Sequence, residues 1–473
     1  MQDDKKISKK LAKHPFWGLI LMVILTVILT WLIPAGQYDR YVNEAGLTVV
    51  DPSSFHYVEN NPAGIADMFR SFYYGFTKAA GVMGAVSFVG GAFGVLKGIG
   101  ILNAAVVGLT HKMRNKPFYL LAGTVMLAIA LHHSFTGFRE LDVVFVALMI
   151  PICLEMGYDT MTGAGVVLLG STVGFTCALA NPFFTGIAHE IAELPMYSAM
   201  WFRGMVMLTF LLIGLLYINS YAKKVKADPT KSITFALEAE SRARFIRGTN
   251  SDEAGADQLT TREKVAGCSF LIVFAYMVFG CIKLGFGFAE VAACFFAMSL
   301  LTGFIAGKNL NEICYLFTQG IADILVAIYI IFFARAILVL MEDALIIDTV
   351  IHFLSQFVIG SSSVLSAVIV FILQCLINFF IPSGSGQAVI TMPIITPLAD
   401  MGGITRQVAC LASQLGDGIT NYIYPTNGGL LATLAVAGLS YAHWAKFAWK
   451  IILLMVILCA VFVAGAQMIG LML

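Results

Sequence analysis

Charged residues are scarce in this chain. Of its 473 residues only 12% are Asp, Glu, Lys or Arg, whereas 59% are hydrophobic. A water-soluble domain normally carries about 25% charged residues, because its surface must face water. The composition therefore excludes an ordinary soluble globule and indicates an integral membrane protein. The formal net charge of +1 gives no positive excess for a nucleic acid partner.

Paired cysteines are missing as well. The nine cysteines occur singly, in or beside apolar segments, and no C-x-x-C pair is present. Isolated thiols of this kind behave as small buried hydrophobic side chains. They predict neither a disulfide framework nor a cysteine metal site.

Complete enzyme motifs are also absent. The segment "HEIAE" at 189–193 lacks the second histidine of the H-E-x-x-H zinc motif. In "PSGSGQ", Ser383 stands where a G-x-S-x-G nucleophile elbow requires glycine. His132 and His133 are adjacent, and neighbours on a helix point in different directions. We expect a protein that is not an enzyme and that carries no cofactor.

Long hydrophobic runs fill the chain instead. The first, Phe16 to Ile33, follows a lysine cluster and spans about 18 residues, longer than the ~7–15 residues of a signal peptide and enough to cross a bilayer. Cytoplasmic segments carry the lysine and arginine excess. We therefore expect a multi-pass protein of the bacterial cytoplasmic (inner) membrane, with its N-terminus inside, residues 36–62 outside and the polar residues 222–264 inside. Two linking spans, 265–282 and 288–306, then return the chain to the cytoplasm.

The chain predicts an internal duplication. Pairs of identical residues recur at an offset of 245 or 246 positions: Gly75 and Gly320, Pro151 and Pro397, Gly170 and Gly416, Asn181 and Asn427. We expect a first repeat over 63–221 and a second over 308–473, with an N-terminal part (1–62), a cytoplasmic loop (222–264) and two linking helices (265–307) outside them. The first repeat begins outside and the second inside, so the repeats are inverted. Inverted repeats are typical of secondary transporters.

Each repeat has two interruptions in its apolar runs. Residues 377–400, "INFFIPSGSGQAVITMPIITPLAD", contain Pro382, Gly384 and Gly386 between two apolar halves, and a counterpart lies near 133–150. Glycine permits non-helical backbone, and proline lacks an N–H group. Broken helices are expected near 164–186 ("ALANPFFTG") and 406–435 ("YIYPTNGGL"). Because irregular backbone survives in a membrane only beside protein or a watery cavity, we expect two re-entrant hairpins and two broken helices around a central site.

Candidate substrate-binding residues lie at these four interruptions. Helix N-termini favour anions, while neutral oxygens suit a small cation. The sequence leaves open whether a sodium ion binds near Ser383, Ser385, Asn181 and Asn427. The coupling ion is expected to be sodium or a proton. Arg335 lies in an apolar run, where an ion pair with Asp323 or Asp343 is expected. The candidates are Thr136, Gly137, Arg139, Glu140, Asn181, Pro182, Ser383, Gly384, Ser385, Gly386, Gln387, Asp417, Asn421, Thr426 and Asn427.

At these segments the sequence resembles the YfcC group of the DcuC-type carriers, within the ion transporter superfamily. The resemblance runs from "IPAGQY" at 33–38 onward and is most specific in "NFFIPSGSGQAVITMPIITPLAD", "LASQLGDGITNYIYPT" and "GYDTMTGAGVVLLGSTVGFTCALANPFFTGIA". It implies a homodimer in which a transport domain moves as an elevator against a scaffold. It also implies basic amino acids or four-carbon dicarboxylates as substrates. Where the family's first tip reads G-x-A-E-E, this chain has Gly137-Phe138-Arg139-Glu140-Leu141, which favours an acidic or zwitterionic substrate.

The sequence thus predicts an all-α secondary active transporter for a small charged metabolite. An amino acid is the first substrate class, in a basic amino acid antiporter, with Asp417 or Glu140 facing the amine. A four-carbon dicarboxylate is the alternative, with Arg139 and both hairpin tips sharing the carboxylates. An ion channel would share the re-entrant loops, but an inverted duplication favours alternating access.

Overall fold

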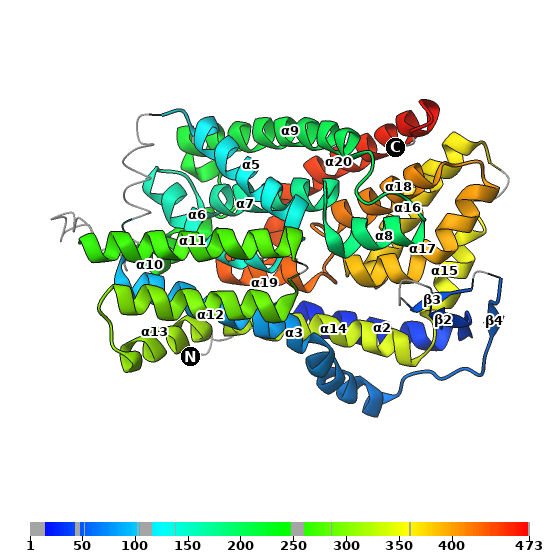
Figure 1. Ribbon diagram of the computed structural model, residues 1–473, viewed down its shortest axis with the longest axis horizontal. Helices are drawn as coiled ribbons and strands as arrows, with labels where there is room; N and C mark the ends of the chain where they lie inside the picture. The colour runs from blue at the N-terminus through cyan, green and yellow to red at the C-terminus, as the bar shows by residue number, and fades with distance from the viewer. Residues whose placement is uncertain are drawn as a thin grey trace.

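The computed structural model describes residues 15–42, 48–51, 53–101, 104, 116–137, 139–246, 260–284, 286–358 and 361–471. This part of the chain is almost entirely helical, and most helices run along the long axis of the molecule (Figure 1). Eight of the described helices are long and apolar enough to cross a membrane. The expectation of a helical, multi-pass membrane protein is therefore confirmed.

The helices before residue 228 include one of 35 residues, α3, and several short pieces around the breaks. They are α2 (Pro15–Leu32), α3 (Ile65–Ile99), α5 (Phe118–Thr136), the 3-10 turn η1 (Arg139–Leu141), α6 (Asp142–Glu155), α7 (Thr160–Cys177), the π-helical turn η2 (Pro182–Gly186), α8 (Ile187–Ile191) and α9 (Met200–Ala227).

The helices after residue 228 begin with a short polar group. These are the 3-10 turns η3 (Pro229–Lys231) and η4 (Phe235–Leu237) and the helix α10 (Glu238–Phe245). The others are α11 (Thr261–Lys283), α12 (Phe288–Ile305), α13 (Leu310–Asp323), α14 (Leu325–Asp343), α15 (Ile347–Ser355), α16 (Ser363–Phe380), α17 (Gly384–Met401), α18 (Arg406–Thr420), α19 (Gly428–Ala437) and α20 (Tyr441–Met468).

The helices form two layers. In the lower layer of Figure 1, α3 contacts α12, α13 and α14, while α2 lies against α14 and α11 against α12. In the upper layer, α5, α6 and α9 pack on α7, and α16 and α20 pack on α18. Helix α19 contacts both α14 and α6. The two layers therefore meet along α14 and α19.

Small residues let the helices of the upper layer approach closely. All 18 residues of α7 are buried. A Cβ on Gly174 would lie 2.3 Å from the carbonyl oxygen of Ala130 on α5, and one on Gly418 of α18 would lie 2.3 Å from Cα of Thr176. No side chain fits at such distances, so glycine is required where α7 crosses α5 and α18.

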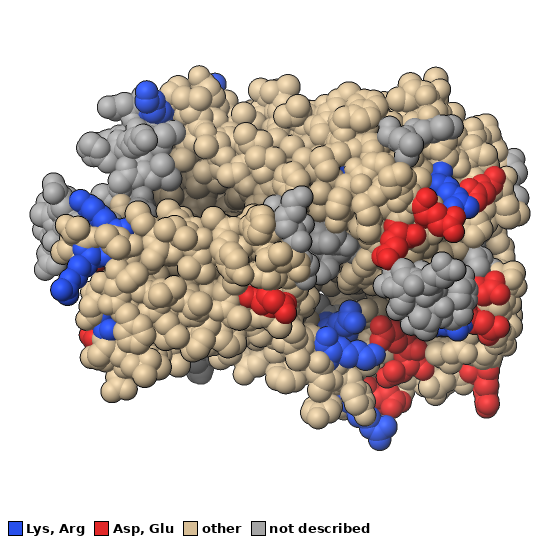
Figure 2. Space-filling model, in the orientation of Figure 1, with Lys and Arg blue, Asp and Glu red and all other residues tan. Residues whose placement is uncertain are grey.

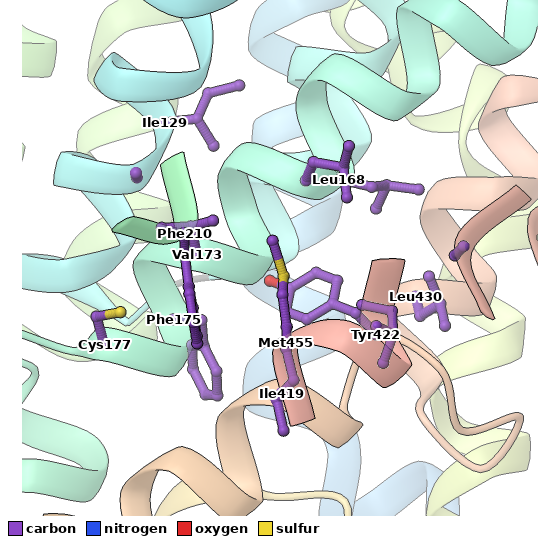
Figure 3. Packing of buried hydrophobic residues seen from close by; sticks show 14 of the residues in the cluster. Ile129, Leu168, Val173, Phe175, Cys177, Phe210, Ile419, Tyr422, Leu430 and Met455 are labelled. Atoms are coloured by element: carbon purple, nitrogen blue, oxygen red, sulfur yellow. The ribbon is translucent and has the colours of Figure 1, made fainter. Parts of the chain in front are cut away.

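The main hydrophobic core lies in this upper layer. Figure 3 shows Val173 of α7, Met455 of α20 and Ile419 of α18 within this core, and α18 packs on both α7 and α20. Much of the remaining apolar surface faces outward: on the face shown in Figure 2, wide areas carry no charged side chain. Such surface is expected of a protein whose solvent is lipid.

Four short strands lie at one end of the long axis. Strand β1 (Gly36–Gln37) pairs antiparallel with β4 (His56–Tyr57), and β2 (Arg40–Val42) pairs antiparallel with β3 (Thr48–Val50). The polar helix α10 lies at the opposite end (Figure 1). The segments expected outside and inside the membrane are therefore at opposite ends of the molecule, and their orientation stays a prediction.

Two carboxylates, the buried Asp159 and the half-buried Glu238, fix the polar segment 228–245. Asp159 caps α7 by accepting from the N–H of Thr162 at 2.8 Å, and it also accepts from the hydroxyls of Tyr221 and Ser232, both at 2.6 Å. Glu238 accepts from the N–H of Thr160 at 3.0 Å. Part of the predicted cytoplasmic loop thus docks on the start of α7.

Candidate functional site

Helices end at all four predicted interruptions. Helix α5 ends before Gly137, and α6 begins after the turn Arg139–Leu141; α7 ends at Cys177. In the second half, α16 and α17 are separated by residues 381–383, and α18 and α19 by residues 421–427. These breaks put unpaired helix termini in the interior, where each needs a partner.

A cavity of about 330 Å³ lies where these breaks meet the lower layer. Its walls come from α3, η1, α7, α12, α14, the start of α17 and the start of α19. Both layers therefore contribute to it. Its lining residues are Lys78, Ala79, Val82, Gly137, Arg139, Phe175, Phe288, Ile331, Arg335, Leu338, Pro382, Ser383, Gly384, Ser385, Thr426, Asn427, Gly428 and Gly429.

Two helix N-termini open into the cavity. Ser383 caps α17, its Oγ accepting from the N–H of Gly386 at 3.4 Å, and Gly384 and Ser385 follow in the wall. Asn427 caps α19, its Oδ1 accepting from the N–H of Leu430 at 2.9 Å. The first N–H groups of a helix lack partners within the helix and carry partial positive charge. Both ends can therefore bind an anion.

Three cationic side chains line the same cavity. Arg139 lies over the ring of Phe175, with its guanidinium carbon 4.4 Å from the ring centroid. Lys78 forms an ion pair with Glu342. Arg335 of α14 has a buried Nε with no hydrogen-bond partner. Among the described lining residues there is no carboxylate, so Arg139 and Arg335 bring positive charge to the cavity, whereas Glu342 offsets the charge of Lys78.

The expected pairing of Arg335 is wrong. Asp323 forms its ion pair with Lys97, at 3.1 Å, and across the described ranges Arg335 has no ion pair with Asp343 or any other acid. Arg335 was expected to be structural, but its place in the cavity wall makes it a candidate for contact with the substrate.

Lys78 was not singled out from the sequence. The signal that could have found it is a single cation near the middle of an apolar run, "FYYGFTKAAG", because charges at membrane depth are costly and mark functional sites.

The structure divides the predicted site residues into two groups. Those in the cavity wall are Gly137, Arg139, Ser383, Gly384, Ser385, Thr426 and Asn427. Those outside the wall are Thr136, Asn181, Gly386, Gln387, Asp417 and Asn421. The side chains of Glu140 and Pro182 lie outside the described part of the structure.

Several residues behind the wall hold the breaks in place. Gln387 donates to Oε1 of Gln374 at 2.6 Å, on the far side of α17. Asn421 accepts from the amide of Asn427 at 2.6 Å and donates to the carbonyl oxygen of Asp417 at 2.8 Å. These side chains position the cavity wall rather than face the cavity.

Asp417 is a fully buried acid beneath the tip of the second hairpin, residues 383–387. Its Oδ1 accepts from the amide of Asn421 at 3.2 Å, while its Oδ2 has no hydrogen-bond partner. A Cβ on Gly384 would lie 3.4 Å from that Oδ2. Only the backbone of Gly384 therefore separates Asp417 from the cavity.

The chain is 29% identical over 96% of its length to the Escherichia coli protein named "Putative basic amino acid antiporter YfcC", covering 96% of that protein. It is also 29% identical over 95% of its length to an uncharacterized protein of Haemophilus influenzae, covering 96% of it.

Two solved structures are similar at lower sequence identity. The YdaH transporter of Alcanivorax borkumensis matches with a TM-score of 0.45 and 16% identity, over 97% of this chain and 99% of that one. MtrF of Neisseria gonorrhoeae, described as one of a class of antimetabolite efflux pumps, matches with a TM-score of 0.45 and 17% identity, over 95% of this chain and 94% of that one.

The family model described as DcuC, C4-dicarboxylate anaerobic carrier, matches residues 15–468. This span includes all four breaks and the whole cavity wall. The chain therefore belongs to the DcuC family of membrane transporters.

Proposed function

We propose that this protein is a secondary active carrier whose substrate is a small dianion of the dicarboxylate class. The observation that carries the proposal is the charge of the cavity: Lys78, Arg139 and Arg335 line it together with the N-termini of α17 and α19. Charge-assisted hydrogen bonds from arginine to carboxylate are among the strongest that side chains make.

Cations line the cavity from both layers, which supports a substrate with two carboxylates rather than one. Arg139 belongs to the upper layer, beside the two helix N-termini, while Arg335 and Lys78 belong to α14 and α3 of the lower layer. A dicarboxylate can therefore contact both layers at once. The cavity of about 330 Å³ falls at the lower end of the ~300–1,000 Å³ of small-molecule sites, as a four-carbon substrate requires.

A basic amino acid is the second candidate, and Asp417 is the observation that favours it. Its unpartnered Oδ2 lies next to Gly384 of the cavity wall, and a shift of the tip would bring an amine to it. Against this, a basic amino acid carries net positive charge and would meet Arg139 and Arg335 without a described acid in the wall, since Lys78 is paired with Glu342. Like charges in a site of low dielectric repel strongly.

A thermal-shift experiment on the purified protein tests the proposal. A ligand raises the melting temperature only if it binds the folded state. We expect succinate or malate to stabilise the protein, and lysine or arginine to leave it unchanged. Asp417→Asn should keep the dicarboxylate response. Stabilisation by lysine that disappears in Asp417→Asn would instead establish the amino acid carrier.

The mode of transport follows from the same placement. We propose that the upper layer moves as an elevator against the lower one, because the cavity lies between them. We also propose that the protein forms a homodimer in the bacterial cytoplasmic membrane. Saturable exchange in proteoliposomes supports a carrier, whereas single-channel currents would establish a channel.

A further inference from the structure

A buried histidine and a buried aspartate face each other on the two sides of the first tip. Nε2 of His133 in α5 lies 3.1 Å from Oδ1 of Asp142 at the start of α6, an ion-pair distance, and neither atom has a hydrogen-bond partner among the described residues. Both side chains are at most 3% exposed. Arg139 lies between the two positions in the chain, in the turn that joins α5 to α6.

The hydrogen bond of Nδ1 sets the tautomer of a neutral His133. Nδ1 of His133 lies 2.8 Å from the carbonyl oxygen of Ile129. A carbonyl only accepts, so Nδ1 carries hydrogen and donates. The lone pair of a neutral His133 is then on Nε2, opposite a carboxylate oxygen of Asp142. Two acceptors at 3.1 Å repel, and a proton taken up by the pair removes this repulsion and cancels its charge.

The other oxygen of Asp142 continues the chain toward the second half. Ser171 of α7 donates to Oδ2 of Asp142 at 2.5 Å. Since the hydroxyl hydrogen of Ser171 is used there, Tyr422 donates its own hydroxyl hydrogen to Ser171. Tyr422 belongs to the break between α18 and α19. The pair is thus connected to two of the four breaks, one in each half.

Other titratable side chains lie on the elements around this pair. His132 bonds Thr136 and stacks near Phe274, Arg203 donates to the carbonyl oxygen of Leu179, and α19 has no titratable residue. At membrane depth, the titratable groups on the elements that pack against the pair include Lys78, His132, Arg139, Glu140 (side chain outside the described part), Cys153, Cys177, Arg203, Tyr217, Cys268 and Tyr276, and Tyr422 lies in the nearby break.

We propose that His133 and Asp142 form the proton-binding site that couples transport to the proton gradient. The inference rests on the dianion carrier proposed above. With its proton, the pair holds α5 to α6 and leaves Arg139 free for the substrate. Without it, the pair carries a charge of −1 that repels across the tip and competes with the substrate for Arg139. Proton and dianion therefore bind together, which makes the protein a symporter: the proton comes from water on one side and returns to water on the other.

The variant Asp142→Asn separates coupling from binding. Its amide N–H can donate to Nε2 of His133 and its oxygen can accept from Ser171, which imitates the protonated pair permanently. His133→Gln removes the titrating ring, and His132→Gln is the matched control one position away.

The experiment measures succinate uptake and proton entry together in proteoliposomes. For the wild type and His132→Gln, we expect proton entry with succinate and an affinity that falls as pH rises. For Asp142→Asn, we expect pH-independent binding and exchange, with loss of proton entry and of accumulation driven by a pH gradient. Unchanged proton entry per succinate in both Asp142→Asn and His133→Gln would overturn the inference.

A measurement without substrate keeps the two proposals distinguishable. The melting temperature of the wild type should fall relative to that of Asp142→Asn as the solution becomes alkaline, because only the wild-type pair loses a buried proton. If this difference is the same at every pH, the proton site is refuted. If it changes with pH while the wild type transports no dicarboxylate, the dianion proposal fails and the proton site stands.

Discussion

Arg139 lies over the ring of Phe175, with the guanidinium carbon 4.4 Å from the ring centroid. This contact joins the first tip to α7 and sets where the positive charge enters the cavity. A cation–π contact away from water contributes up to about 2 kcal/mol. Phe175→Leu keeps an apolar side chain but removes the ring, so we expect succinate to bind about 5- to 30-fold more weakly.

Isothermal titration of the purified variant checks this prediction. Phe118→Leu is a suitable control, since that ring packs on Tyr158 and lies outside the described cavity wall. Wild-type affinity in Phe175→Leu would mean that the ring does not orient Arg139.

The helix crossing at Gly174 predicts a steric effect. Gly174→Ala places a methyl group 2.3 Å from the carbonyl oxygen of Ala130, so α5 and α7 must separate. Overpacking of this kind costs about 1–3 kcal/mol. We expect a lower melting temperature, measured by thermal unfolding in detergent. Gly465→Ala is the matched control, because nothing lies within 4 Å of its new Cβ; equal effects of the two changes would contradict the crossing.

The ion pair between Arg40 and Asp348 ties the strands to α15. Arg40 donates to both carboxylate oxygens, at 3.0 and 2.9 Å, and Asp348 is 4% exposed. Hydrogen bonds to charged groups contribute about 1.5–3 kcal/mol, so Arg40→Gln should lower the free energy of unfolding by about 1–2 kcal/mol.

Denaturant unfolding with Arg70→Gln as control checks the loss. Arg70 is 68% exposed in its pair with Asp67, and exposed pairs contribute less than about 1 kcal/mol. A larger loss in Arg70→Gln than in Arg40→Gln would refute the anchoring role.

Glu238 predicts a pH effect on stability. Burial raises the pKa of Glu238, and hydrogen bonds from Thr234 and Thr160 offset this only in part. As pH rises, the unfolded chain loses this proton before the folded one does, so folding is weakened between the two pKa values. Glu238→Gln has no proton to lose and should be more stable than the wild type at neutral pH.

The same comparison at acid pH is the internal control. Below the ordinary glutamate pKa both states are protonated, so the advantage of Glu238→Gln should disappear. Glu240→Gln on the exposed side of α10 should show no such dependence. A difference between Glu238→Gln and the wild type that does not change with pH would contradict the assignment.

The breaks could be predicted from the sequence because their chemistry is local. Pro382, Gly384 and Gly386 end a helix whatever surrounds them, and the structure ends α16 and begins α17 there. Arg139 and Asn427 were found for the same reason, since each lies at a helix terminus that faces the cavity.

The rest of the site depends on which face of each helix meets the cavity. The polarity of the residues alone does not predict that face. Gln387 follows the tip in sequence, but it is buried against Gln374. Arg335 was seen as an intramembrane charge, yet its neighbours come from helices distant in the chain. Lys78 required knowledge that α3 packs beside α14. Long-range packing, which no local pattern encodes, decides these positions.

Uptake of radiolabelled succinate into proteoliposomes by the wild type and Arg335→Gln tests whether the cavity binds a dianion. Arg242→Gln, an exposed position on α10, is the control. Loss of one charge-assisted contact of at least about 1.4 kcal/mol corresponds to a factor of ten, so we expect Arg335→Gln to raise the KM for succinate at least about tenfold and Arg242→Gln to leave it unchanged. An unchanged KM in Arg335→Gln, or uptake of lysine but not of succinate by the wild type, would contradict the account of the cavity as a dianion site.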